Sequence, residues 1–180
     1  MRAFVAIFPP PEVREKALGT ARRLIPNSRI RWSKPENVHL TLKFLGDVRE
    51  ETLGDLHAIL EGVCARHAPF DVGLAGLGAF PSARRARILW TGVDRGSEQL
   101  RSLAADLDEA LVSLSFEREE RSYEPHLTLG RVRGRPVSLK LPGEANQDLR
   151  FQTRRVELTQ STLTDKGAVY KTVRVNVLEE

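Results

Sequence analysis

The sequence contains very little cysteine and has no long apolar run. Cys64 is the single cysteine among 180 residues, so no disulfide forms within the chain and nothing indicates an oxidising compartment. No apolar segment reaches the roughly 20 residues of a membrane-spanning helix, and the N-terminus lacks the pattern of a signal peptide. We therefore expect a cytoplasmic protein without a membrane partner, in which Cys64 is a small buried residue rather than a nucleophile.

Several motifs that mark known function classes are also missing. The chain has no P-loop, no nucleotidyl-transfer lysine motif, no His-Glu-x-x-His and no pair of cysteines for zinc. It has no RNP-type aromatic pair, no zinc knuckle and no Gly-x-x-Gly loop in a KH-like setting. These absences argue against an ATP-dependent ligase, a zinc hydrolase and the common RNA-binding modules, and we expect neither metal nor cofactor.

The bulk composition fits one compact protein. Hydrophobic residues make up 41% of the chain, which is enough for a sizeable core, and the 29% of charged residues mix both signs. The formal net charge is +4 and the isoelectric point is about 9.6. This charge fits an anionic partner and an ordinary solvated surface about equally well.

Apolar periodicity predicts an α+β fold with an antiparallel sheet and external helices. Expected helices cover 12–24, 50–66 and 97–114, and expected strands cover 2–8, 29–32, 38–46, 70–80, 86–93 and 126–132. Segments 148–163 and 168–178 are predicted to form a terminal hairpin around the turn residues Asp165, Lys166 and Gly167. Each half of the chain holds a helix, a polar turn and then a strand that contains the same tetrapeptide.

That tetrapeptide is His-Leu-Thr-Leu, and it holds two of the four histidines. It occupies residues 39–42 and 126–129, so the two histidines lie 87 positions apart, about half the chain. The spacing indicates an internal duplication. Because residues two apart on a strand share a face, His39 and Thr41 point the same way, and so do His126 and Thr128.

Two imidazoles and two hydroxyls on facing halves favour acid–base chemistry at phosphorus. The unperturbed pKa of imidazole is about 6.5, so a pair can hold one neutral and one protonated member. One ring then takes a proton from the nucleophile while the other gives a proton to the leaving group. The threonine hydroxyls are donors for the oxygens on which charge develops.

At these residues the sequence resembles the two-histidine (2H) phosphoesterase superfamily, whose mark is a pair of His-x-Thr/Ser-x motifs. It is most similar to the RNA 2′,3′-cyclic phosphodiesterases, first described as bacterial 2′-5′ RNA ligases. The likeness covers almost the whole chain, including "RWSKPENVHLTLKFLGDV" and "YEPHLTLGRV". It implies a single bilobal domain over residues 1–180, with two similar lobes that each carry an antiparallel sheet and external helices around a central groove.

The resemblance also implies an activity and its residues. The family hydrolyses RNA 2′,3′-cyclic phosphate ends to 2′-phosphates without metal or cofactor, and no protein partner is expected. By motif position, His39 is the proton donor to the departing O3′ and His126 is the proton acceptor that activates water, although the sequence leaves these two roles exchangeable. Thr41 and Thr128 are expected to bind the phosphate oxygens.

Four neighbouring residues are further candidates for substrate binding. Strict alternation places Lys43 on the face of His39 and Thr41, and it places Arg131 on the opposite face unless a bulge intervenes near Gly130. Trp32 and Phe44 have rings that could stack on a base, although strand aromatics more often belong to a core. His57 and His67, in contrast, lie in a helical segment and are expected to be ordinary surface or boundary residues.

Other functions remain as alternatives at this point. They are ATP-independent 2′-5′ RNA ligation by reversal of a phosphoester reaction, hydrolysis of another 2′-5′ or cyclic nucleotide, metal-dependent hydrolysis, and RNA binding without catalysis. Turnover of an RNA ending in a cyclic phosphate, with and without chelator, distinguishes among them.

Overall fold

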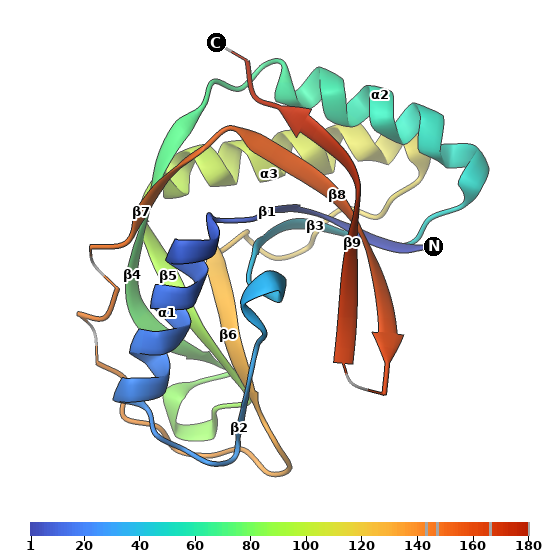
Figure 1. Cartoon of the computed structure of the whole chain (residues 1–180). Helices are drawn as coiled ribbons and strands as arrows, with labels where there is room; N and C mark the ends of the chain where they lie inside the picture. Colours follow the sequence, from blue (N-terminus) through green and yellow to red (C-terminus); the bar gives the residue numbers. More distant parts are fainter. Residues whose placement is uncertain (143, 147, 166, 180) are drawn as a thin grey trace.

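A computed structural model describes residues 1–142, 144–146, 148–165 and 167–179. Over these residues the chain forms nine strands and three helices, so the fold is α+β as predicted (Figure 1). The helices are α1 (Pro11–Leu24), α2 (Leu53–Cys64) and α3 (Ser97–Leu111). The strands are β1 (Arg2–Ile7), β2 (Ile30–Trp32), β3 (Leu40–Asp47), β4 (Phe70–Phe80), β5 (Ile88–Arg95), β6 (His126–Val132), β7 (Arg150–Thr153), β8 (Arg155–Thr164) and β9 (Gly167–Val177).

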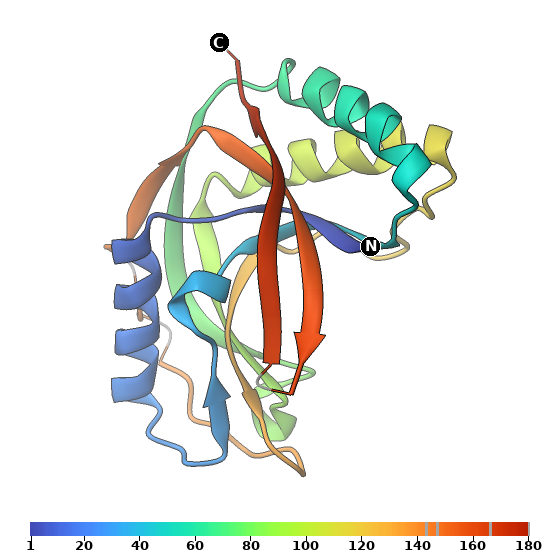
Figure 2. The same ribbon diagram turned by 45° about the vertical axis from the view of Figure 1, so that its right-hand side comes forward.

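The strands form one curled sheet, in which two groups of four strands lie on either side of a central junction. The order is β7-β4-β5-β6-β3-β1-β8-β9, with β2 paired to β6, and these strands pair antiparallel. The group β7-β4-β5-β6 meets the group β3-β1-β8-β9 at the pair Leu40 and Leu127 (Figures 1 and 2). These leucines are the second residues of the two tetrapeptides, so the motifs meet where the halves join.

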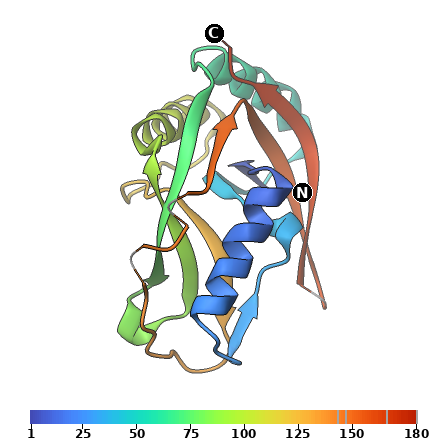
Figure 3. The same ribbon diagram turned by 60° about the vertical axis from the view of Figure 1, so that its left-hand side comes forward.

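Three helices cover the sheet, each through a regularly spaced apolar face. α2 and α3 lie side by side and pack against β9 and β3, respectively, whereas α1 lies along β6 (Figures 1 and 3). In α3 the apolar face is formed by Leu100, Leu103, Leu107 and Leu111, all fully buried at helical spacing. Each buried leucine contributes about 2 kcal/mol of apolar transfer free energy, which fixes the helix against the sheet.

The C-terminal segment departs from the prediction at one point. Residues 148–163 were expected to be one arm of a hairpin, but the chain leaves β7 at Thr153 and enters β8 at Arg155. β7 pairs with β4 and β8 pairs with β1, so the chain crosses here from one half of the sheet to the other. Alternation shows that a segment is extended but not which strand it pairs with. The β8–β9 hairpin forms as expected, and Lys166 of its turn lies outside the described residues.

The three helices of the described segments are too short or too polar to cross a bilayer.

Candidate active site

His39 lies at the entry to β3, directly after the short 3-10 turn η1 (Pro35–Asn37). Its Nδ1 is 2.8 Å from the carbonyl oxygen of Asn37. A carbonyl only accepts hydrogen bonds, so Nδ1 donates, and in the neutral ring the lone pair resides on Nε2. The ring is thereby oriented with Nε2 as the reactive atom.

His126 repeats this arrangement in the other half. Its Nδ1 donates across 2.7 Å to the carbonyl oxygen of Glu124, which also lies two residues before the ring. Both motif histidines therefore expose Nε2 through the same local backbone geometry. A pair with matched orientation suits two proton transfers on opposite sides of one substrate.

The pairing of the two strands brings the four motif side chains together. Leu40 pairs with Leu127 in antiparallel register. Continuing the register by one residue sets His39 opposite Thr128 and Thr41 opposite His126, at the separation of cross-strand neighbours. We call the side of the sheet that carries these four residues the motif face. Their leucine neighbours point into the core and are fully buried.

The two threonine hydroxyls have no hydrogen-bond partner among the residues that the structure describes, and both side chains are half-buried. They are therefore available as donors to a bound oxygen.

Burial controls the charge of His39. Removal from water lowers its pKa from 6.5 to about 4; the hydrogen bond to Asn37 opposes this shift and the charge of His126 adds to it. In the free protein at neutral pH, the ring of His39 is neutral.

Aromatic rings surround both histidines, and sequence reasoning missed most of them. Phe4 stacks on His39 with ring centroids 4.8 Å apart, and Phe8 and Tyr170 lie 5.2 and 5.3 Å from the same ring. Phe80 and Trp90 lie 5.1 and 6.0 Å from His126. Alternation along residues 4–8 could have placed Phe4 and Phe8 on one face. Nothing local indicated that this face meets His39.

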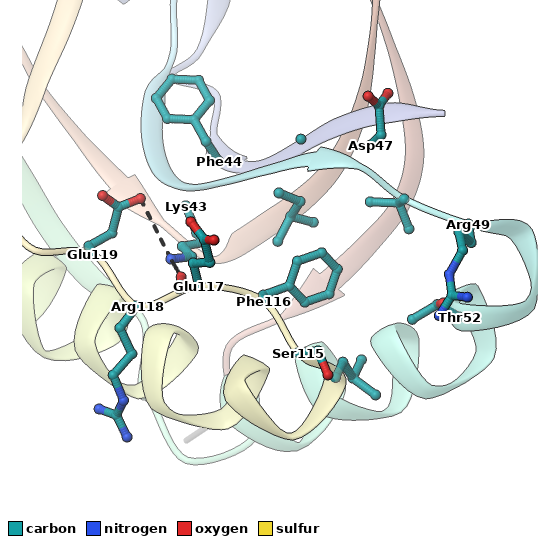
Figure 4. Close-up of a pocket in the computed structure, with 14 residues that line it drawn as sticks. Lys43, Phe44, Asp47, Arg49, Thr52, Ser115, Phe116, Glu117, Arg118 and Glu119 are labelled. Atoms are coloured by element: carbon teal, nitrogen blue, oxygen red, sulfur yellow. Dashed lines mark hydrogen bonds and ion pairs between the residues drawn. The ribbon is translucent and has the colours of Figure 1, made fainter.

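The expectation for Lys43 is wrong, because a β-bulge interrupts β3. Val5 pairs with Lys43 and Ala6 pairs with Thr41, which leaves Leu42 as the extra residue. The bulge turns Lys43 to the helix side, where it is 3% exposed. There its Nζ lies 2.6 Å from Asp108 Oδ1. Nζ also donates across 2.6 Å to the carbonyl oxygen of Glu117 and lies 3.6 Å from Glu119 Oε1 (Figure 4).

The same bulge turns Phe44 to the motif face. Phe44 is 67% exposed and its ring centroid is 6.4 Å from that of Phe4, which stacks on His39. Figure 4 shows Phe44 and Lys43 on opposite sides of β3. The surface pocket in that view, about 480 Å³ in volume, lies between β3 and the loop after α3. It is therefore not the site that the motif histidines form.

A second bulge, at the equivalent place in β6, decides the orientation of Arg131. Trp90 pairs with Thr128 and Leu89 pairs with Gly130, so Leu129 is the extra residue. Arg131 consequently points to the motif face and is exposed. Burial raises the pKa of Tyr170, and the charge of Arg131 partly offsets this shift, which places Arg131 within electrostatic range of a ring that contacts His39.

The remaining candidates take structural positions. Cys64 is fully buried, and burial raises the pKa of its thiol to about 12, so it is an unreactive core residue. Nε2 of His67 lies 2.8 Å from Asp106 Oδ2, which links the turn after α2 to α3. Trp32 is half-buried in β2. Within the described segments, no three His, Cys, Asp or Glu side chains are grouped so that they could hold a metal ion.

Comparison with known proteins agrees with this geometry. The family model described as LigT like Phosphoesterase matches twice, over residues 7–90 and 92–170, with one His-Leu-Thr-Leu motif in each match. The RNA 2′,3′-cyclic phosphodiesterase of Archaeoglobus fulgidus is 36% identical over 180 residues, covering 97% of this chain and 99% of that protein.

Solved structures show the same architecture. The protein TT0787 of Thermus thermophilus superposes with a TM-score of 0.86 at 28% identity, covering 99% of this chain and 98% of that one. E. coli LigT complexed with phosphate gives a TM-score of 0.80 at 25% identity, with the same coverage. The repeated family match, the relatives and the paired histidines lead to one conclusion: the chain belongs to the LigT-like phosphoesterases of the 2H superfamily.

Proposed function

We propose that this protein hydrolyses the 2′,3′-cyclic phosphate at an RNA end and leaves a 2′-phosphate. The observation that carries this proposal is the matched pair of histidines, each held by Nδ1 and each exposing Nε2 on the motif face. Relatives that span nearly the whole chain are named RNA 2′,3′-cyclic phosphodiesterase, which supports the same substrate.

In the proposed reaction, His126 is the base and His39 is the acid. Nε2 of His126 takes a proton from a water molecule as the water oxygen bonds to phosphorus. The P–O3′ bond breaks on the opposite side, and O3′ receives the proton from Nε2 of His39. The product carries a 2′-phosphate and a 3′-hydroxyl, and proton exchange with solvent restores both rings.

The acid role requires that substrate binding changes the charge of His39. The ring is neutral in the free protein because burial lowers its pKa to about 4. A phosphodiester anion beside the ring favours the imidazolium and therefore raises this pKa. Thr41, Thr128 and Arg131 complete the phosphate site, with two neutral donors and one guanidinium for the non-bridging oxygens.

The terminal base is placed by Phe44 in this proposal. Its ring is largely exposed on the motif face and neighbours Phe4, which stacks on His39. An exposed ring beside a phosphate site is suited to stack on a nucleobase of any sequence. We also propose that the two halves act as one bilobal domain, because each contributes one histidine and one threonine to the same site.

The direct test is incubation with an oligoribonucleotide that ends in a 2′,3′-cyclic phosphate, followed by identification of the product. We expect a 2′-phosphate end and an unchanged rate in excess chelator, because the proton transfers use side chains of the chain itself. A 3′-phosphate product, or loss of activity on chelation with recovery on adding a divalent ion, contradicts the proposal. Joining of a second RNA would instead indicate ligation.

A further inference from the structure

The charges of this protein are separated between its two ends. Segments 27–35, 81–93 and 127–142 hold ten of the 28 lysine and arginine residues and none of the 24 acidic residues. The rest of the chain therefore has 18 basic against 24 acidic residues, a formal charge of −6. The modest net charge of +4 conceals this separation.

The three basic segments form one surface in the fold. β2 pairs with β6 through Arg31 and Arg131, and β5 pairs with β6 from Ile88 onward. The Arg29 guanidinium donates to the carbonyl oxygens of Arg133 and Arg135, which fixes the two loops together. Segment 81–93 joins the same surface through the bridge between Ala86 and Val137. We call this surface the arginine-rich end; it lies at the lower edge of Figure 1, around β2 and the end of β6.

The basic side chains of this end are exposed and face few counter-charges. Arg84, Arg85, Arg133 and Arg135 are all exposed, and among the described residues none of these four forms an ion pair with a carboxylate. The opposite end is acidic: segments 47–64 and 97–124, which contain α2 and α3, hold 13 acidic and four basic residues. A polyanion is therefore attracted to one end of the molecule and repelled from the other.

The arginine-rich end is continuous with the motif face. Arg131 belongs to it and lies in β6, the strand that also carries His126 and Thr128. Arg131 and Phe44 are the third residues after the two motif threonines, and both follow a bulge. Because β3 and β6 are antiparallel, these two side chains leave the four motif residues in opposite directions. On one side of the four motif residues lies the aromatic ring of Phe44, and on the other side lie Arg131 and the further arginines of the arginine-rich end.

We propose that the arginine-rich end binds the RNA strand on the 5′ side of the terminal nucleotide. This proposal rests on the proposed function and specifies the substrate as a polynucleotide chain rather than a mononucleotide. In a terminal nucleotide the base leaves the ribose at C1′ and the chain leaves at C4′, on the two sides of the cyclic phosphate. With the base on Phe44, the strand runs past Arg131 toward Arg133, Arg135, Arg84 and Arg85.

The test compares two substrates and two variants. The quadruple variant Arg84→Gln, Arg85→Gln, Arg133→Gln, Arg135→Gln removes charge only beyond the catalytic residues. The matched control is Arg154→Gln with Arg155→Gln, an exposed arginine pair at the start of β8 and outside the arginine-rich end. Each protein is assayed on a nucleoside 2′,3′-cyclic phosphate and on a single-stranded oligoribonucleotide with the same end, over a range of salt concentrations.

We expect the quadruple variant to lose kcat/KM on the oligoribonucleotide and to keep the parental value on the mononucleotide. The slope of log kcat/KM against log salt for the oligoribonucleotide should flatten by about 0.7 for each phosphate contact removed. The control variant should change neither kcat/KM on either substrate nor the salt slope.

An equal loss of kcat/KM on both substrates, an unchanged salt slope or an equal effect of the control variant overturns the proposal. If the parent hydrolyses neither substrate, the proposed function fails instead. Thermal unfolding of each variant shows whether it is folded, and anisotropy of a labelled 2′-phosphate oligoribonucleotide provides an independent measure of binding.

Discussion

At the scale of the residue, the motif histidines owe their chemistry to backbone carbonyls two positions before each ring. Asn37 and Glu124 orient the rings through main-chain atoms, so the identity of these two side chains does not supply the orientation. The pattern His-x-Thr-x was sufficient to predict the four motif residues and their shared face. It could not predict the buried, neutral state of His39, because Phe4 and Tyr170 come from strands distant in sequence.

Replacement of either motif histidine by alanine removes one proton-transfer partner. We expect His39→Ala and His126→Ala each to lower kcat by about a hundred- to ten-thousand-fold. The double variant should lose far less than the product of the single losses, because the two rings act as one unit. Single-turnover rates provide the measurement, and His57→Ala, on α2, is the matched control. Near-parental turnover in either motif variant would remove that histidine from the mechanism.

The threonine hydroxyls are tested by Thr41→Val and Thr128→Val, which keep the shape of the side chain. Loss of one donor to a developing oxyanion should lower kcat/KM by up to about a thousand-fold. Melting temperatures should remain close to that of the parent, because neither hydroxyl bonds to another described residue. Unfolding of either variant would instead assign the hydroxyl a structural role.

The low pKa of His39 predicts a pH-dependent stability. The folded-state pKa of about 4 lies below the unfolded value of 6.5, so the unfolded chain binds more protons between these values. Stability is therefore complete above about pH 6.5 and falls on acidification, by about 2 kcal/mol from this residue between pH 7 and pH 5. Denaturant unfolding of the parent and of His39→Gln at both pH values measures this contribution. An equal loss in the two proteins contradicts it.

At the scale of the element, two bulges decide which side chains lie on the motif face. Alternation predicted the strands and their buried faces. The extra residues Leu42 and Leu129 shift the alternation by one position, so the side chains after each bulge point to the opposite face from the predicted one. As a result, Phe44 rather than Lys43 lies on the motif face in β3, and Arg131 rather than Gly130 lies on it in β6. A bulge is a property of two paired strands, so one strand's sequence does not reveal it.

The ion pair that Lys43 forms instead links β3 to α3. We expect Lys43→Met to destabilise the protein by about 3 kcal/mol, because the carboxylate of Asp108 is left largely buried without its partner. The additional change Asp108→Leu should restore most of the loss, and kcat/KM of the folded single variant should remain near the parental value. Urea unfolding and steady-state kinetics measure the two effects. A large loss of kcat/KM with unchanged stability would instead indicate that Lys43 contacts the substrate.

At the scale of the whole molecule, the continuous sheet predicts that both halves unfold together. Trp32 and Trp90 lie in β2 and β5, so their fluorescence reports on the half that contains β6, whereas far-ultraviolet circular dichroism reports on the entire chain. Because β3 and β6 join the halves and together carry the four motif residues, we expect coincident thermal transitions by both probes. Two separate transitions would show that the halves are independent domains.

The pairing of Leu40 with Leu127 also bears on why the two halves occupy one chain. A half-length protein could assemble this site only by associating with an identical copy, and symmetry would then give both imidazoles the same surroundings and the same proton affinity. One chain removes that constraint, since each half can change alone. Phe44 and Arg131 occupy matching positions, yet one is aromatic and the other cationic. Fusion of the two halves therefore allows a nearly symmetric scaffold to carry different side chains at its two ends. If Phe44 binds the base and Arg131 the strand, as proposed, a substrate whose two ends differ binds productively in one orientation only.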